Sequence, residues 1–72
     1  MPKLPLNPRV IMRRLKKLGF IEDHVTGSHV VFYHPTHKRR AVVPKHSGDL
    51  PKGTVHAILR ESGISTTDFL SA

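Results

Sequence analysis

The sequence predicts an α+β domain in which one helix precedes and another follows a three-stranded antiparallel sheet, in the order α-β-β-β-α. An amphipathic segment with helix-capping residues comes first, three apolar runs separated by short turns follow, and a second amphipathic segment comes after them. Strands joined by such short turns pair antiparallel. A three-stranded sheet needs cover on one face, so we expect both helices to pack on one face and leave the other open.

The first helix is predicted to begin at the pair Asn7-Pro8 and to end at Gly19. Asparagine caps free N–H groups, and proline at the first helical position gives up an N–H that has no partner. One face of the helical wheel is apolar, with Met12 at its edge, and carries Ile11, Leu15 and Leu18. The opposite face is cationic and carries Arg9, Arg13, Lys16 and Lys17.

The three strands are predicted over residues 20–25, 28–34 and 39–43, and Pro44 ends the last of them. Side chains alternate between the two faces of a strand. His29 and Tyr33 carry polar groups and lie on the same face of the strand. We therefore expect the opposite face, with Val30 and Phe32, to be the one that packs in the core. The other set, which would lie on the open face, is His29, Val31 and Tyr33.

The second helix is predicted from about Lys52 to Ser62, with Gly63 as its stop. A capping-box pattern from Ser65 to Asp68 then predicts a last helical turn that carries Phe69 and Leu70. We expect residues 1–72 to form a single domain, with residues 1–6, which include two prolines, as a loose lead-in.

Charge is the strongest compositional signal in this chain of 72 residues. Twelve Lys and Arg face five acids, which gives a formal net charge of +7. Such a basic single domain is typical of nucleic-acid binding, although an acidic protein partner could also neutralise the surface. The chain has no cysteine, no apolar run near the length of a membrane span and no visible signal peptide. We therefore expect a cytoplasmic protein without a membrane role.

Two kinds of catalytic site are disfavoured by the sequence. The five acids are scattered, and the only adjacent pair is Glu22-Asp23, whereas metal-dependent nucleases need clustered carboxylates. His34 and His37 could chelate a metal ion, but no third ligand is evident, so we expect no metal and no cofactor. A nucleophilic Ser28 is disfavoured as well, because neighbouring strand residues point to opposite faces and His29 could not deprotonate it.

Metal-free acid–base chemistry on RNA remains, with His29 at its centre. Histidine exchanges protons near neutral pH, so a positioned imidazole can take the proton of a ribose 2′-hydroxyl, which then attacks the adjacent phosphorus. A second group should protonate the leaving 5′-oxygen. The sequence leaves open which group does so, and the candidates besides solvent are His46, Lys45 and Tyr33.

Several short motifs, in this order and spacing, resemble the HicA family of small mRNA-cleaving toxins from toxin–antitoxin modules. They are Lys17-Leu18-Gly19-Phe20, Gly27-Ser28-His29, His34-Pro35, Val42-Val43-Pro44 with His46, Lys52-Gly53-Thr54, Ile58-Leu59, and Ser62-Gly63-Ile64-Ser65 with Phe69-Leu70. The resemblance covers almost the whole chain, from about Asn7 to Leu70. One departure concerns Val30, where many members carry a second histidine directly after the first.

The resemblance implies a double-stranded-RNA-binding-like α-β-β-β-α fold and a catalytic role for His29. It also implies two partners, an mRNA substrate and a HicB-type antitoxin that blocks access to RNA. We thus expect an endoribonuclease whose RNA backbone is held by Lys38, Arg39, Arg40 and Lys45, with secondary contacts from Arg13, Lys16 and Lys17. Because a duplex-RNA module reads shape, we expect little base specificity. A non-catalytic double-stranded RNA-binding module and a protein-interaction domain are the alternatives.

Overall fold

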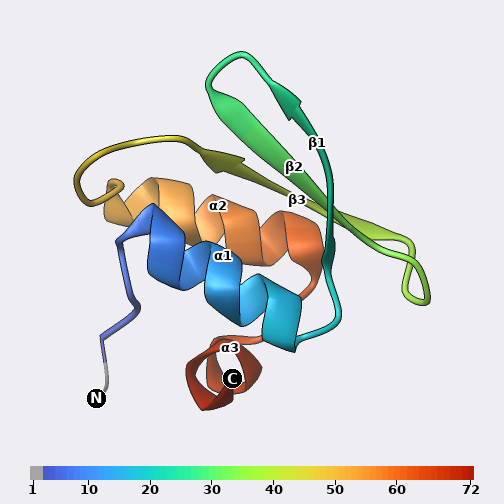
Figure 1. Cartoon of the computed structure of the whole chain (residues 1–72). Coiled ribbons are helices and arrows are strands. Elements are labelled where there is room, and N and C mark those ends of the chain that lie inside the picture. The colour runs from blue at the N-terminus through green and yellow to red at the C-terminus, as the bar shows by residue number, and fades with distance from the viewer. Residues whose placement is uncertain (1–2) are drawn as a thin grey trace.

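In the computed structural model, which describes residues 3–72, the chain forms three helices and three strands. In chain order these are α1 (Pro8–Lys17), β1 (Ile21–Thr26), β2 (His29–His34), β3 (Arg39–Pro44), α2 (Lys52–Ser62) and α3 (Thr66–Ser71) (Figure 1). The strands form one antiparallel sheet in the order β1-β2-β3. The predicted α+β fold is confirmed, and it is consistent with the double-stranded-RNA-binding type. The last helical turn forms α3.

Helix α1 has the predicted cap and the predicted buried face. The Asn7 side chain accepts a hydrogen bond from the backbone N–H of Arg9 at 2.9 Å, and Pro8 occupies the first turn. Ile11 and Leu15 are fully buried, and Leu18 packs against the core as a partly buried residue. Burying these side chains fixes the helix against the sheet, so its cationic face points to solvent.

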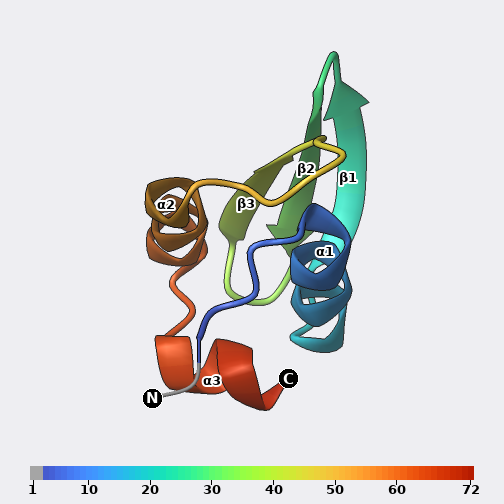
Figure 2. The same cartoon turned by 90° about the vertical axis from the view of Figure 1, so that its left-hand side faces the viewer.

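The core lies between one face of the sheet and the helices. Val30 and Phe32 of β2 pair with Val43 and Ala41 of β3, and all four are buried in one apolar cluster with residues of α1 and α2. Helix α2 lies near the edge strand β3, and α1 contacts both edge strands, β1 and β3 (Figure 2). The predicted core face of β2 is therefore confirmed.

Strand β1 is an edge strand whose six residues are all exposed. The hairpin that joins it to β2 extends past the helices (Figure 1), which leaves Val25 47% exposed although it pairs with the buried Val30. The pairing register shifts between Glu22 and His24. A bulge of this kind bends a strand and re-aims its side chains.

Helix α3 is held at both ends by side chains. The Ser65 hydroxyl accepts a hydrogen bond from the backbone N–H of Asp68, as the capping pattern predicted. At the other end, Arg14 of α1 donates from Nη1 to the carbonyl oxygens of Phe69, Leu70 and Ala72. A cation beside the free carbonyls of a helix C-terminus is stabilising. Arg14 therefore fastens α3 to the first helix.

The segment before α1 differs from the loose lead-in that the sequence suggested. Leu4 and Leu6 pack against the core as partly buried residues, and the Leu6 carbonyl accepts a hydrogen bond from the backbone N–H of Leu50 at 2.8 Å. Residues 1 and 2 lie outside the described part. No helix within residues 3–72 has the length and apolar character that spanning a membrane requires.

Candidate active site

His29 opens β2 at the turn of the first hairpin and is exposed. It pairs with Thr26 on one side and with Pro44 on the other, and alternation puts it on the face opposite the buried Val30. Its Nδ1 lies 3.4 Å from the Ser28 hydroxyl oxygen, and Nε2 makes no hydrogen bond within residues 3–72. That nitrogen is available to a substrate.

The position of Ser28 corrects one step of the sequence argument. Alternation along a strand predicted that Ser28 would point away from His29, but Ser28 belongs to the turn and β2 starts one residue later. The rule of alternating faces does not apply to a turn residue, and the hydroxyl lies beside the ring. At 3.4 Å the contact is long, so Ser28 orients the imidazole only weakly.

A surface depression of about 290 Å³ has His29 in its wall. Strand β3 contributes Val42 and Pro44, and the remaining lining residues come from α2: Thr54, Ala57, Ile58 and Glu61. The depression thus combines apolar walls, a hydroxyl group, a carboxylate and an imidazole, which suits a ligand with a flat apolar part and polar edges. Sequence analysis missed Thr54 and Glu61, because only the packing of α2 against β3 brings them near His29.

The three suggested helper residues lie at different distances from His29. Lys45 lies next to the start of β2, because its backbone N–H donates to the carbonyl of Ser28, the residue before His29. This bond extends the β2–β3 pairing by one residue. The His46 ring is turned toward its own loop, with Nδ1 3.2 Å from the N–H and 3.1 Å from the carbonyl oxygen of Gly48. Tyr33 shares the face of His29 but stands four residues further along β2, roughly 13 Å away.

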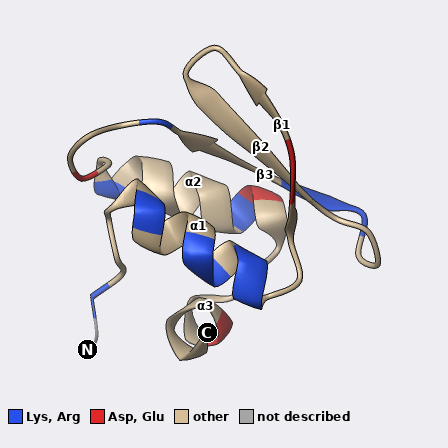
Figure 3. Cartoon of the chain, viewed as in Figure 1, with Lys and Arg blue, Asp and Glu red and all other residues tan. Residues whose placement is uncertain are grey.

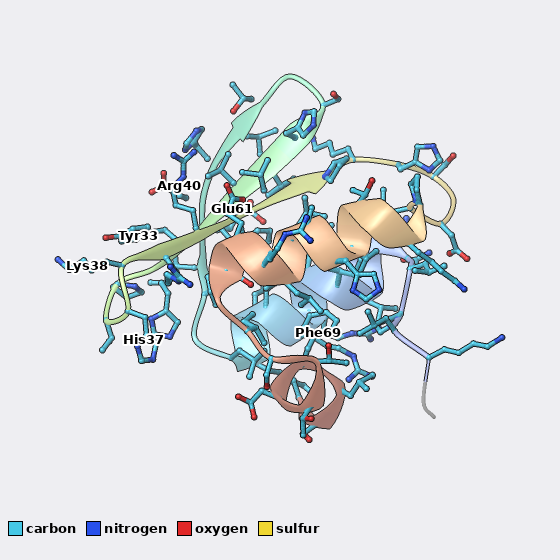
Figure 4. All side chains as sticks on the ribbon, turned by 180° about the vertical axis from the view of Figure 1, so that it is seen from behind. Tyr33, His37, Lys38, Arg40, Glu61 and Phe69 are labelled. Carbon is cyan, nitrogen blue, oxygen red and sulfur yellow. The ribbon has the colours of Figure 1, made fainter. Side chains whose placement is uncertain are left out.

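The predicted RNA-binding cations fall into separate groups. Lys38, Arg39 and Arg40 are at the β2–β3 turn, at the far end of the sheet from His29 (Figure 4). The Arg39 guanidinium also lies against Gly63 after α2. Helix α1 carries the second group (Figure 3), where an open groove of about 620 Å³ is lined by Arg9, Met12, Arg13, Lys16, Lys17 and Glu22. Lys45 is the predicted cation on the His29 side.

The remaining histidines have different surroundings. The His34 ring covers Gly19 and stacks edge-on against Phe20, with ring centroids 5.1 Å apart, and its Nδ1 accepts from the N–H of His37 at 3.1 Å. Both histidines therefore have local roles at the β2–β3 turn. Within residues 3–72, no three His, Asp or Glu side chains are grouped as a set of metal ligands.

His24 differs from these because it lies on the outer face near His29. It pairs with Val31, so it shares a face with the side chains of His29 and Val31. Its Nδ1 is 2.7 Å from Oδ2 of Asp23, and both side chains are exposed. The β1–β2 hairpin sets this register, because the pairing runs regularly from Thr26 and His29 at the turn to His24 and Val31.

Comparison with known proteins gives one match. A family model described as the HicA toxin of bacterial toxin–antitoxin systems matches residues 9–64, from the start of α1 to just past α2. A search of curated proteins finds no match. The matched range contains the whole sheet, the two longer helices and every side chain of the depression around His29. By this match over most of its length, the chain belongs to the HicA toxin family, whose members are the toxins of toxin–antitoxin modules.

Proposed function

We propose that this protein is a metal-independent endoribonuclease that cleaves mRNA by histidine acid–base catalysis. The observation that carries the proposal is the position of His29, an exposed imidazole in the wall of a depression on a protein of net charge +7. Membership of a toxin family supports a destructive activity toward a cellular polymer. The basic surface supports RNA as that polymer.

The reaction begins at the ribose 2′-hydroxyl. His29 accepts the proton through Nε2, and the 2′-oxygen attacks the adjacent phosphorus while the bond from phosphorus to the 5′-oxygen breaks. The products are a 2′,3′-cyclic phosphate and a free 5′-hydroxyl. DNA has no 2′-hydroxyl, so this mechanism is restricted to RNA by its chemistry.

Two features near His29 support binding of the reacting phosphate. Thr54, in the first turn of α2, lies in the same depression, and Pro51 gives that helix no side-chain cap. The backbone N–H of Thr54 donates to the Pro51 carbonyl at 3.0 Å, so the Thr54 hydroxyl is the group that can contact a phosphate oxygen. Together with the Lys45 ammonium group it can stabilise the charge that builds up on the phosphoryl oxygens.

The more distant cations suit the RNA on either side of the cut. Helix α1 and the β2–β3 turn each present exposed basic side chains, which can contact phosphates without reading sequence. We propose Lys38, Arg39, Arg40 and Lys45 as the main contacts, and Arg13, Lys16 and Lys17 as secondary ones.

We further propose that a HicB-type antitoxin inhibits the toxin by covering the His29 depression. The depression is open to solvent and lies between β3 and α2, with His29 in its wall, where a bound protein would exclude RNA. Acidic side chains on such a partner would match the basic surface.

The test is incubation of a labelled mRNA with the purified parent protein and two variants in EDTA. We expect the parent and the control variant His37→Ala to cut the RNA, and His29→Ala, at equal folded fraction, to be at least about 100-fold slower. Equal cleavage by His29→Ala would refute histidine catalysis. Intact RNA in every lane, with salt-sensitive binding retained, would identify a non-catalytic RNA-binding module instead.

A further inference from the structure

Resting on the proposed function, we propose that His24 is the second proton-transfer residue, which protonates the leaving 5′-oxygen of the RNA. The register of β1 against β2 carries this inference. Thr26 pairs with His29, and His24 stands two residues before Thr26. His24 is therefore the diagonal neighbour of His29 on the same face of the sheet.

Diagonal neighbours of an antiparallel pair have their Cα atoms about 7–8 Å apart. Imidazole rings that extend from two such positions can contact opposite sides of one phosphate group. One ring then lies near the 2′-oxygen and the other near the 5′-oxygen. Two of the other suggested donors fit less well. Tyr33 is roughly 13 Å along the strand, and the His46 ring is held by Gly48. Val30, beside His29, is buried in the core.

The contact with Asp23 prepares the His24 ring for this role. Asp23 Oδ2 lies 2.7 Å from Nδ1, which is short enough for a charge-assisted hydrogen bond. When Nδ1 donates its hydrogen to this carboxylate, Nε2 becomes the nitrogen that faces a substrate. Neighbouring residues of a regular strand point to opposite faces, so the contact between Asp23 and His24 depends on the bulge at Asp23, which re-aims the side chains there.

The proton balance closes with the two histidines. His29 starts neutral and takes the 2′-hydroxyl proton, while the bond between phosphorus and the 2′-oxygen forms. His24 starts protonated and gives its Nε2 proton to the 5′-oxygen, as the bond between phosphorus and that oxygen breaks. The phosphodiester then has become a cyclic phosphate and an alcohol, and the two histidines have exchanged protonation states.

A substrate that needs no proton donor separates this role from a structural one. In RNA whose scissile 5′-oxygen is replaced by sulfur, the thiolate leaves without protonation. On ordinary RNA we expect His24→Ala to be about 100-fold slower or worse, and on the sulfur-containing RNA to regain a rate within a few fold of the parent. His29→Ala should stay slow on both. The matched control is His56→Ala, an exposed histidine of α2, which should behave as the parent.

Each outcome is decisive. A His24→Ala variant that cuts ordinary RNA at the parental rate, or that stays equally slow on the sulfur-containing RNA, overturns the role of His24 but leaves cleavage by His29 in place. A folded parent that cuts neither RNA overturns the proposed function itself, and the role of His24 with it. Circular dichroism of each variant checks that the fold is retained.

Discussion

Replacing Arg14 by methionine is expected to destabilise the domain by about 2–3 kcal/mol. Its Nη1 lies 3.0, 2.9 and 3.3 Å from the carbonyl oxygens of Phe69, Leu70 and Ala72. Nη1 carries two hydrogens, so we count two bonds, each at about 1 kcal/mol because the site is only partly buried. The guanidinium also sits 6.0 Å from the centroid of the Phe69 ring, which adds about 0.5–1 kcal/mol.

The assay is urea unfolding at 25 °C followed by circular dichroism, with Arg13→Met as the matched control. Arg13 is the exposed neighbour on the same helix, and it makes no side-chain hydrogen bond within residues 3–72. Its replacement should change stability by less than about 0.5 kcal/mol. In a thermal scan, Arg14→Met should melt about 10–20 °C below the parent. Equal unfolding midpoints for the two variants would refute the reasoning.

Three further predictions concern the core, a turn and the charged surface. Phe32→Ala should lower the free energy of unfolding by about 3–5 kcal/mol, which is as much as the whole stability expected of so small a domain. Circular dichroism at 25 °C should then show a largely unfolded chain, and a cooperative melt close to that of the parent would contradict this. Gly63 has φ +74°, and a Cβ there would meet the Arg39 guanidinium at 2.6 Å, so Gly63→Ala should cost about 1–2 kcal/mol or more; a double-mutant cycle with Arg39→Ala measures the part due to that contact, and no loss in either background would argue against it. Three cations of α1 are changed to glutamine, namely Arg13, Lys16 and Lys17. The slope of log affinity for RNA against log salt should then become less steep by about 0.7–0.9 per lost phosphate contact. An unchanged slope in a KCl titration would show that this helix is not part of the RNA interface.

Most of the fold could be predicted because its signals are local. The cap at Asn7, the alternation along β2 and the glycine after α2 each depend on a few neighbouring residues, and each is found where the sequence placed it. Arg14 could not be placed in this way. Its partners lie 55–58 residues away in the chain, and its position on the helical wheel gives no sign of them.

The candidate site was predictable only in part, because folding brings some of its residues together from distant parts of the chain. His29 stands out because a turn and a strand meet there. The contact that orients His24 depends on a bulge at Asp23, and the position of Glu61 depends on how α2 packs beside β3 (Figure 4). Both are consequences of tertiary structure, and a simple alternation rule misplaced even Ser28, the residue next to His29.

The most direct test of the central claim is cleavage of an RNA that carries a single 2′-deoxynucleotide immediately before the mapped cut. If the 2′-oxygen is the nucleophile, as His29 catalysis requires, the parent protein in EDTA will leave that bond intact. It will still cut the all-ribose RNA at the same bond and leave a 2′,3′-cyclic phosphate, which mass spectrometry detects. Cleavage of the deoxy-substituted bond at an equal rate would contradict the account.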